Sequence, residues 1–203
     1  MKTLISTVLG IFLCAATNVG TCGSLTLTAK PGGEFLTDSW SLLISKPEVA
    51  MLSDYQLKNA VSKRLLQAAT SRINQFVGDR FHAEAIARTI FYESYRAGIE
   101  PELIFAIVEE ATLFKVDFSS QYGNGLLALR DEQVKQFVEE PYPSISSLPY
   151  NVRVGCLLLR HQIDINYGDI FIALKHFTSP IRGAEYPERV LVALKVWSKL
   201  LKK

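Results

Sequence analysis

The sequence is poor in the residues that hold small proteins together covalently or through metals, and it has no marked excess of one charge. It contains only three cysteines and three histidines in 203 residues. Cys14, Cys22 and Cys156 are too scattered for a disulfide framework or a zinc site. The 22 lysines and arginines nearly balance the 20 aspartates and glutamates and form no basic cluster, so nothing favours a nucleic acid partner. We expect no metal, no cofactor and no nucleic acid.

Long apolar runs are also missing, apart from one near the start. After Lys2, residues 4–16 form an apolar run that is shorter than the stretch of about 20 residues a membrane-spanning helix needs. A basic residue, a short apolar run and small residues at its end are typical of a secretory signal peptide. Cleavage after Ala16 and cleavage after Gly23 both fit this pattern. With residues 1–23 removed, we expect an exported protein of the periplasm or cell envelope with no membrane span.

The rest of the chain has helical periodicity and no convincing strand alternation, which predicts an all-α fold. Proline and glycine mark the helix ends. Gly98 suits the position after a helix, and Pro101 suits the first turn of the next one, where the N–H has no helical partner. The predicted helices cover residues 57–77, 81–97, 101–108, 151–165, 169–177 and 187–201. Pro141, Pro143 and Pro149 predict an irregular segment before residue 151.

Four blocks of the sequence carry more specific patterns. The first is 97–108, AGIEPELIFAIV, followed by Phe114. The second is Gly125-Leu126-Leu127, and the third is 151–161, NVRVGCLLLRH. The fourth consists of the strings Gly168-Asp169, Ala173-Leu174 and Glu185-Tyr186-Pro187. In this order the blocks resemble motifs of the lytic transglycosylase domain, which is SLT-type, lysozyme-like and similar to glycoside hydrolase family 23.

The resemblance implies a lysozyme-like, all-α domain over residues 81–197. It would follow a leader and helical extension at 24–80 and precede a short basic tail at 198–203. Members of this family cleave the bond between N-acetylmuramic acid and N-acetylglucosamine in peptidoglycan without water. One glutamic acid in an apolar pocket protonates the leaving oxygen and then takes a proton from the sugar's own 6-hydroxyl, which closes a 1,6-anhydro ring. The implied partner is therefore a peptidoglycan glycan strand.

The residues that carry this chemistry in the family are replaced here. Counted without a gap from Pro101, the family's glutamic acid falls on Ala111 and its serine on Thr112. The glutamine after Gly-Leu-Met falls on Ala128, and a Tyr-Asn pair of the sugar cleft falls on Phe177-Thr178. Only Tyr186 keeps its family residue. We therefore expect no catalytic residue, and a substrate-binding groove built from Phe114, Leu127, Ala128, Phe177, Thr178 and Tyr186.

Glu110 offers an alternative acid. The family's spacing from the acid to the glycine of Gly-Leu-Met-Gln matches Glu110 to Gly125, whereas Ala111 is one residue too close. A one-residue slip would, however, turn every side chain of the helix by about 100° and break the match over 101–108. A deletion in the following loop accounts for the shorter spacing more simply. In that case Glu109 and Glu110 are expected to be a solvated pair at a helix end.

Three functions remain open at this point. The first is an exported pseudoenzyme of the cell envelope that binds peptidoglycan, or docks a protein, in a groove it no longer uses for catalysis. The second is an active lytic transglycosylase that uses Glu110. The third is a structural adaptor of an envelope machine, in which the helices of residues 37–78 bind the partner and the lysozyme-like part serves as scaffold.

Overall fold

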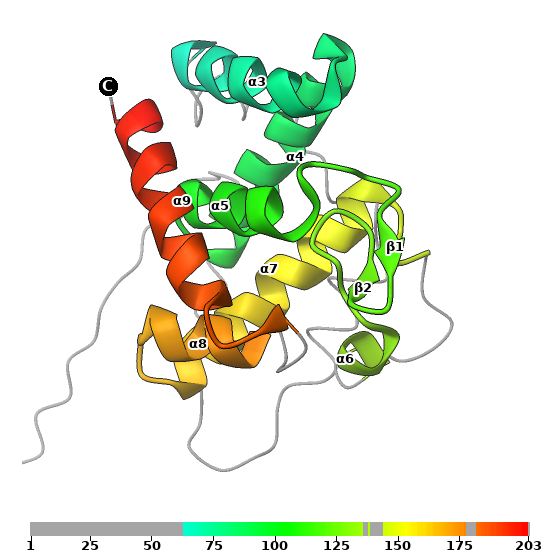
Figure 1. The fold of residues 1–203 in the computed structure, drawn as a ribbon, viewed down its shortest axis with the longest axis vertical. Helices are drawn as coiled ribbons and strands as arrows, with labels where there is room; N and C mark the ends of the chain where they lie inside the picture. Colours follow the sequence, from blue (N-terminus) through cyan, green and yellow to red (C-terminus); the bar gives the residue numbers. More distant parts are fainter. Residues whose placement is uncertain (1–62, 136–137, 139–143, 178–181, 203) are drawn as a thin grey trace, which may run out of the picture. The chain divides into compact units, whose positions relative to one another are not determined.

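The computed structural model describes residues 63–135, 138, 144–177 and 182–202, which belong to one compact unit of the chain. This part is mostly helical, which confirms the predicted all-α class (Figure 1). Its elements are α3 (Lys63–Val77), α4 (Arg80–Ala97), α5 (Pro101–Thr112), β1 (Ser119–Ser120), β2 (Gly123–Asn124), α6 (Asp131–Lys135), α7 (Leu148–Ile165), α8 (Ile170–Phe177) and α9 (Tyr186–Leu201). None of the described helices is both long enough and apolar enough to cross a bilayer. The predicted signal peptide, leader and most of the helical extension lie outside the described residues.

The turn from α4 to α5 lies at Gly98 and Pro101, the two residues from which it was predicted. α4 begins after Asp79, whose carboxylate accepts hydrogen bonds from the backbone N–H groups of Phe81 and His82. It ends at Gly98, which has a φ of 63°, a conformation that costs glycine nothing. α5 then starts with Pro101 in its first turn. These two helix ends are therefore confirmed.

α7 begins three residues earlier than its predicted start at Asn151. Leu148 and Pro149 belong to its first turn, where proline costs no hydrogen bond because the first N–H groups of a helix have no partner within it. The assignment of Pro149 to the irregular segment is therefore wrong. α8 follows Asp169, whose carboxylate accepts from the N–H of Ile172 at 2.9 Å.

α5 is the central helix of the described structure (Figure 1). Residues 103–108 are all buried, because α9 and α4 pack against this helix. A helix that is apolar all round is stable only when its neighbours cover every face. Phe105 of α5 stacks on Trp197 of α9 with 4.5 Å between the ring centroids. Cys156, with apolar neighbours in the sequence, is likewise buried, as expected.

α3 belongs to the same core. Ala69 and Ile73 are fully buried, and the helix packs against α4 and α9. The described part of the predicted extension therefore shares its apolar core with the predicted domain.

A two-stranded hairpin is the exception to the helical architecture. β1 and β2 pair antiparallel, with Ser119 opposite Asn124 and Ser120 opposite Gly123. Gly123 has a φ of 134°, and a Cβ there would overlap the backbone of Ala128. The close approach of the next loop therefore requires glycine at this position.

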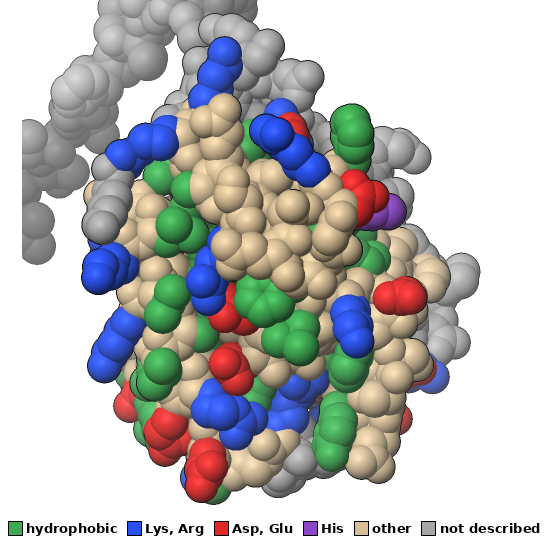
Figure 2. All heavy atoms as spheres, turned by 45° about the horizontal axis from the view of Figure 1, so that its top comes forward, with side chains coloured by type: hydrophobic (Ala, Val, Ile, Leu, Met, Phe, Trp, Pro, Cys, Tyr) green, Lys and Arg blue, Asp and Glu red, His purple; other side chains and the backbone are tan. Residues whose placement is uncertain are grey.

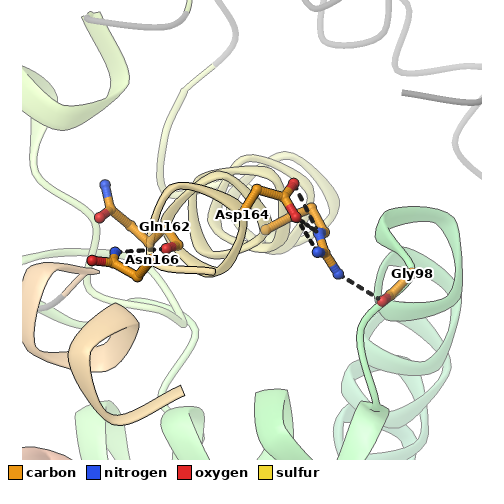
Figure 3. Close-up of polar contacts among 5 residues, drawn as sticks. Gly98, Gln162, Asp164 and Asn166 are labelled. Atoms are coloured by element: carbon orange, nitrogen blue, oxygen red, sulfur yellow. Dashed lines mark hydrogen bonds and ion pairs between the residues drawn. The ribbon is translucent and has the colours of Figure 1, made fainter. Parts of the chain in front are cut away.

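The C-terminal end of α7 is tied to the turn after α4 (Figure 3). Arg160 forms an ion pair with Asp164 one helical turn later, and its Nη1 donates to the carbonyl oxygen of Gly98 at 3.4 Å. Asn166 closes the helix by donating from Nδ2 to the carbonyl oxygen of Gln162 at 2.7 Å. Because Arg160 belongs to the third sequence block, at least this residue of the block has a scaffold role.

Candidate functional site

The sequence blocks meet around the last two turns of α5. Thr112 donates from Oγ1 to the carbonyl oxygen of Leu126 at 2.8 Å, which joins α5 to the second block. Tyr186, from the fourth block, donates from its hydroxyl to the carbonyl oxygen of Ile107 at 3.4 Å. Both side chains are buried. Residues that are 79 positions apart in the chain therefore contribute to one site.

Asn151 joins the third block to the second. Its Oδ1 accepts from the N–H of Leu127 at 2.7 Å, and its Nδ2 donates to the carbonyl oxygens of Asn124 and Ile145 at 3.0 and 2.8 Å. The residue is fully buried, so these bonds satisfy its amide where water has no access. Gly125 lies against this amide, and a Cβ on it would overlap the Asn151 side chain. Asn151 thus holds the loop that follows β2.

Ala111, the residue on which the resemblance would place the family acid, lies in the last turn of α5, which is unbroken from Pro101 to Thr112. The carbonyl oxygen of Ala111 accepts from Nη1 of Arg182 at 3.2 Å. The alanine side chain itself carries no group that exchanges a proton.

Glu110 lies next to this position and is ion-paired. Its Oε2 accepts from Nε of Arg189 at 3.2 Å, and 27% of the Glu110 side chain is exposed. A general acid of this chemistry needs apolar surroundings that keep it protonated. Glu110 instead lies beside the guanidinium of Arg189 and is partly exposed, so its surroundings are not apolar.

Glu109 is not half of a solvated pair, and this expectation from the sequence is wrong. Arg72 of α3 donates to both of its oxygens, at 2.6 and 3.0 Å, and Nε1 of Trp197 donates to Oε2 at 2.8 Å. Only 14% of the Glu109 side chain is exposed. The expectation failed because both partners are distant in the sequence and only folding brings them to Glu109. The carboxylate therefore joins α3, α5 and α9.

Tyr186, the residue that the resemblance implies is kept from the family, is only 1% exposed. Burial raises the pKa of its hydroxyl to about 12, and the charge of Glu110 acts in the same direction against the opposing effect of Arg182 and Arg189. The hydroxyl is therefore a protonated donor at neutral pH. The guanidinium carbons of Arg182 and Arg189 lie 5.2 and 5.6 Å from the centroid of its ring.

Five of the six residues expected to form the groove are buried in the described structure: Phe114, Leu127, Ala128, Phe177 and Tyr186. Phe114, for example, packs against the rings of Phe76 and Trp197, with centroid distances of 5.4 and 6.0 Å. The sixth residue, Thr178, lies outside the described residues. The five buried side chains therefore belong to the core beneath the site and do not form its surface.

Other side chains form that surface, and the sequence analysis missed them. Tyr122 is 37% exposed, and the guanidinium carbon of Arg182 lies 5.9 Å from its ring centroid. Arg189 had a signal, because it lies three residues after Tyr186 and so on the same face of the helix. Arg182 and Tyr122 reach the site from segments between helices, where no periodicity marks them. On the face that Figure 2 shows, acidic, basic and hydrophobic side chains are interspersed.

A further group that the sequence analysis missed is Glu93, which lies between α4 and α7. One oxygen is 3.4 Å from Nη2 of Arg153, and the other is 3.7 Å from Nη1 of Arg96. Burial raises the pKa of Glu93 to about 7, although both arginines oppose this shift. Such a pKa often marks a functional site, but Glu93 is only 2% exposed. Its burial between α4 and α7 indicates a role in packing these helices.

The described fold and site define a small helical protein organised around the C-terminal end of one buried helix. Within the described ranges, no three or more His, Cys, Asp or Glu side chains are grouped so as to hold a metal ion. No protein-family model, no curated protein and no solved structure matches the chain. The resemblance to lytic transglycosylases therefore rests on this chain's own sequence motifs.

Proposed function

We propose that this protein is an exported, lysozyme-like relative of the lytic transglycosylases that has lost catalysis and binds peptidoglycan, or docks an envelope protein, in the bacterial cell envelope. The observation that carries the proposal is the place of Ala111. It occupies the family's acid position, in a helix anchored by the bond from Thr112 to Leu126. A methyl group supplies no proton to a leaving oxygen.

The contacts between the blocks support the family part of the proposal. Motifs that build one site must meet in the folded chain. Here Thr112 bonds to Leu126, Asn151 to Leu127 and Tyr186 to Ile107. Each of these bonds is made by a side chain with a residue from another part of the pattern. A shared fold does not imply a shared activity. The proposed loss of catalysis therefore depends on the replaced acid and not on the fold.

An active transglycosylase that uses Glu110 is the second candidate. It is favoured by one observation: the charge of Glu110 is close enough to Tyr186 to contribute to the raised pKa of that hydroxyl. The ion pair with Arg189 and the partial exposure of Glu110 oppose it, because the acid of this chemistry lies in an apolar pocket.

Digestion of purified peptidoglycan sacculi separates these two candidates. The wild-type chain, Glu110→Gln and the control Glu132→Gln, which alters an exposed residue of α6, are each incubated with sacculi. Soluble 1,6-anhydro-muropeptides are then measured by mass spectrometry. We expect none from any of the three proteins. Products from the wild type and the control that disappear in Glu110→Gln would overturn the loss of catalysis.

Co-sedimentation with sacculi tests the binding half of the proposal. We expect the wild-type chain to pellet with sacculi and to stay in solution without them. If the chain does not pellet with sacculi, peptidoglycan binding is contradicted. Docking to an envelope protein, including the adaptor role, would then remain. Thermal unfolding of the same samples checks that the chain is folded.

A further inference from the structure

We propose that the outer face of α9 is a docking surface for an anionic lipid bilayer, on which the folded protein would lie without spanning it. The face consists of two exposed valines and two exposed lysines: Val192, Lys195, Val196 and Lys199. None of these four residues belongs to the candidate site at the end of α5. The proposed function neither requires this surface nor depends on it.

The outer face of α9 is built from only two residue types. From Val190 to the end of the helix, each exposed residue is a valine or a lysine. Val192 and Val196 are 62% and 43% exposed, and residues four apart in a helix are neighbours on its surface. Lys195 and Lys199 each follow a valine by three residues and lie on the same face. Along the left edge of Figure 2, where α9 runs, basic and hydrophobic side chains alternate.

The opposite side of α9 belongs to the core of the protein. Val190 and Trp197 are fully buried, and Trp197 stacks on Phe105 of α5. The helix therefore cannot insert its larger apolar side into a bilayer while the chain stays folded. The exposed valines can meet the lipid boundary, and the lysine stems can lie along it with their ammonium groups at the lipid phosphates.

The protein does not neutralise the charge of this face. Lys195 and Lys199 form no ion pair in the part of the chain that the structure describes. The nearby carboxylates of Glu109 and Glu110, at the end of α5, are already paired with arginines. α3 and α8, which both pack against α9, contain no acidic residue. A surface with uncompensated positive charge attracts an anionic partner.

The composition of the face favours a lipid surface over a protein as that partner. Protein interfaces are enriched in aromatic residues and arginine and depleted in lysine, and this face has the opposite composition. Two copies of the chain that paired through α9 would bring like charges together. A lysine near an anionic bilayer, in contrast, strengthens binding about fivefold without a fixed geometry.

The test is co-sedimentation with lipid vesicles. The full chain is used together with the chain from Ser24, which lacks the apolar run of residues 4–16, because that run would itself bind lipid. The vesicles contain either phosphatidylcholine alone or equal parts of phosphatidylcholine and phosphatidylglycerol. We expect the chain from Ser24 to bind the anionic vesicles at least about tenfold more tightly than the neutral ones, with an affinity that falls as salt is added.

Variants assign the binding to the face of α9. The double variant Lys195→Gln, Lys199→Gln should lower the affinity for anionic vesicles about tenfold or more. The double variant Val192→Ser, Val196→Ser keeps the charge and should also weaken binding, because it removes the apolar contact. Each effect should occur in the full chain as well as in the chain from Ser24.

The matched control removes the same charge elsewhere. Arg80→Gln with Lys115→Gln alters exposed positions of α4 and of the turn after α5. This control should bind anionic vesicles within about twofold of the wild type, because charges away from the contact are screened by salt. Every altered side chain is exposed, so each variant should unfold at the temperature of the wild type, which a thermal scan checks.

Three results would overturn the inference: equal binding to neutral and anionic vesicles, an unchanged affinity in the folded lysine variant, or an equal loss in the control. Soluble poly-L-glutamate serves as a further probe. If it binds through the same two lysines while anionic vesicles stay unbound, the face would be assigned to an acidic polypeptide and the lipid proposal would fall.

Discussion

Thr112 and Leu126 are joined by a buried hydrogen bond of 2.8 Å from the threonine hydroxyl to the leucine carbonyl oxygen. The same hydroxyl lies 3.2 Å from the carbonyl oxygen of Val108 in its own helix. The bond to Leu126 fixes how α5 is rotated against the loop after β2. The bond therefore ties the last turn of α5, which holds Ala111 and Glu110, to that loop.

Loss of this bond should destabilise the fold. Thr112→Val keeps the shape of the side chain but leaves the buried carbonyl oxygen of Leu126 without its donor. We expect the free energy of unfolding, measured by urea denaturation, to fall by about 1–3 kcal/mol. The control is Thr89→Val, whose hydroxyl bonds to Ala85 within its own helix at a surface site and should cost about 0.5 kcal/mol or less. Equal losses in the two variants would contradict the prediction.

Two glycines with similar backbone angles should respond differently to alanine. Gly125 and Gly78 have φ values of 72° and 69°, so the left-handed conformation costs each alanine about 1–2 kcal/mol. Nothing lies within 4 Å of a Cβ at Gly78, whereas one at Gly125 would overlap the amide of Asn151. We expect Gly125→Ala to be less stable than Gly78→Ala by about 1–3 kcal/mol in urea denaturation. Equal stabilities would show that Asn151 moves aside at no cost.

The ion pair between Arg72 and Glu109 should be worth more than a surface pair. The arginine makes two hydrogen bonds to the carboxylate, and the side chains are 25% and 14% exposed. A double-mutant cycle with Arg72→Ala and Glu109→Ala should give a coupling energy of about 1–2 kcal/mol. The pair Arg88–Glu84, with exposures of 39% and 40%, should give about 0.5 kcal/mol. A coupling no larger than this would mean that α3 is held by its apolar face alone.

Glu93 should make the fold less stable as the pH rises. Its pKa is about 7 in the folded chain against an ordinary value of 4.5, so the folded state binds the extra proton between these values. The resulting stability is complete below about pH 4.5 and is lost as the pH rises through 7, with a limiting slope of about 1.4 kcal/mol per pH unit. Glu93→Gln is neutral at every pH and should flatten this part of the stability profile. A slope that persists in the variant would assign it to another group.

Local signals in the sequence predicted the helices well. Gly98 and Pro101 end and begin helices where predicted, since the conformation of glycine and the missing N–H of proline act within one turn of the chain. The start of α7 was missed because proline is excluded from a helix interior but tolerated in the first turn. Signals of this kind therefore locate the end of a helix only to within a few residues.

The structure shows which residues expected at the candidate site meet and which of them are buried. Thr112 and Tyr186 form buried hydrogen bonds around the last two turns of α5. Phe114 and the four other described residues expected to line a groove are buried. The sequence could not show this, because it marks a residue as apolar without showing what covers it. Arg182 was overlooked for a related reason: its partners, Ala111 and Tyr122, are distant in the chain.

By itself the sequence determined the helical class of this protein, because helix periodicity is a local property. Only the tertiary structure decided how the charges are used. Glu109 is bonded to Arg72 and Trp197, Glu110 is paired with Arg189, and Arg182 bonds to the backbone of Ala111. The energy of a charge depends on its burial and on the groups that packing brings within a few ångströms of it, and sequence position alone does not contain that information.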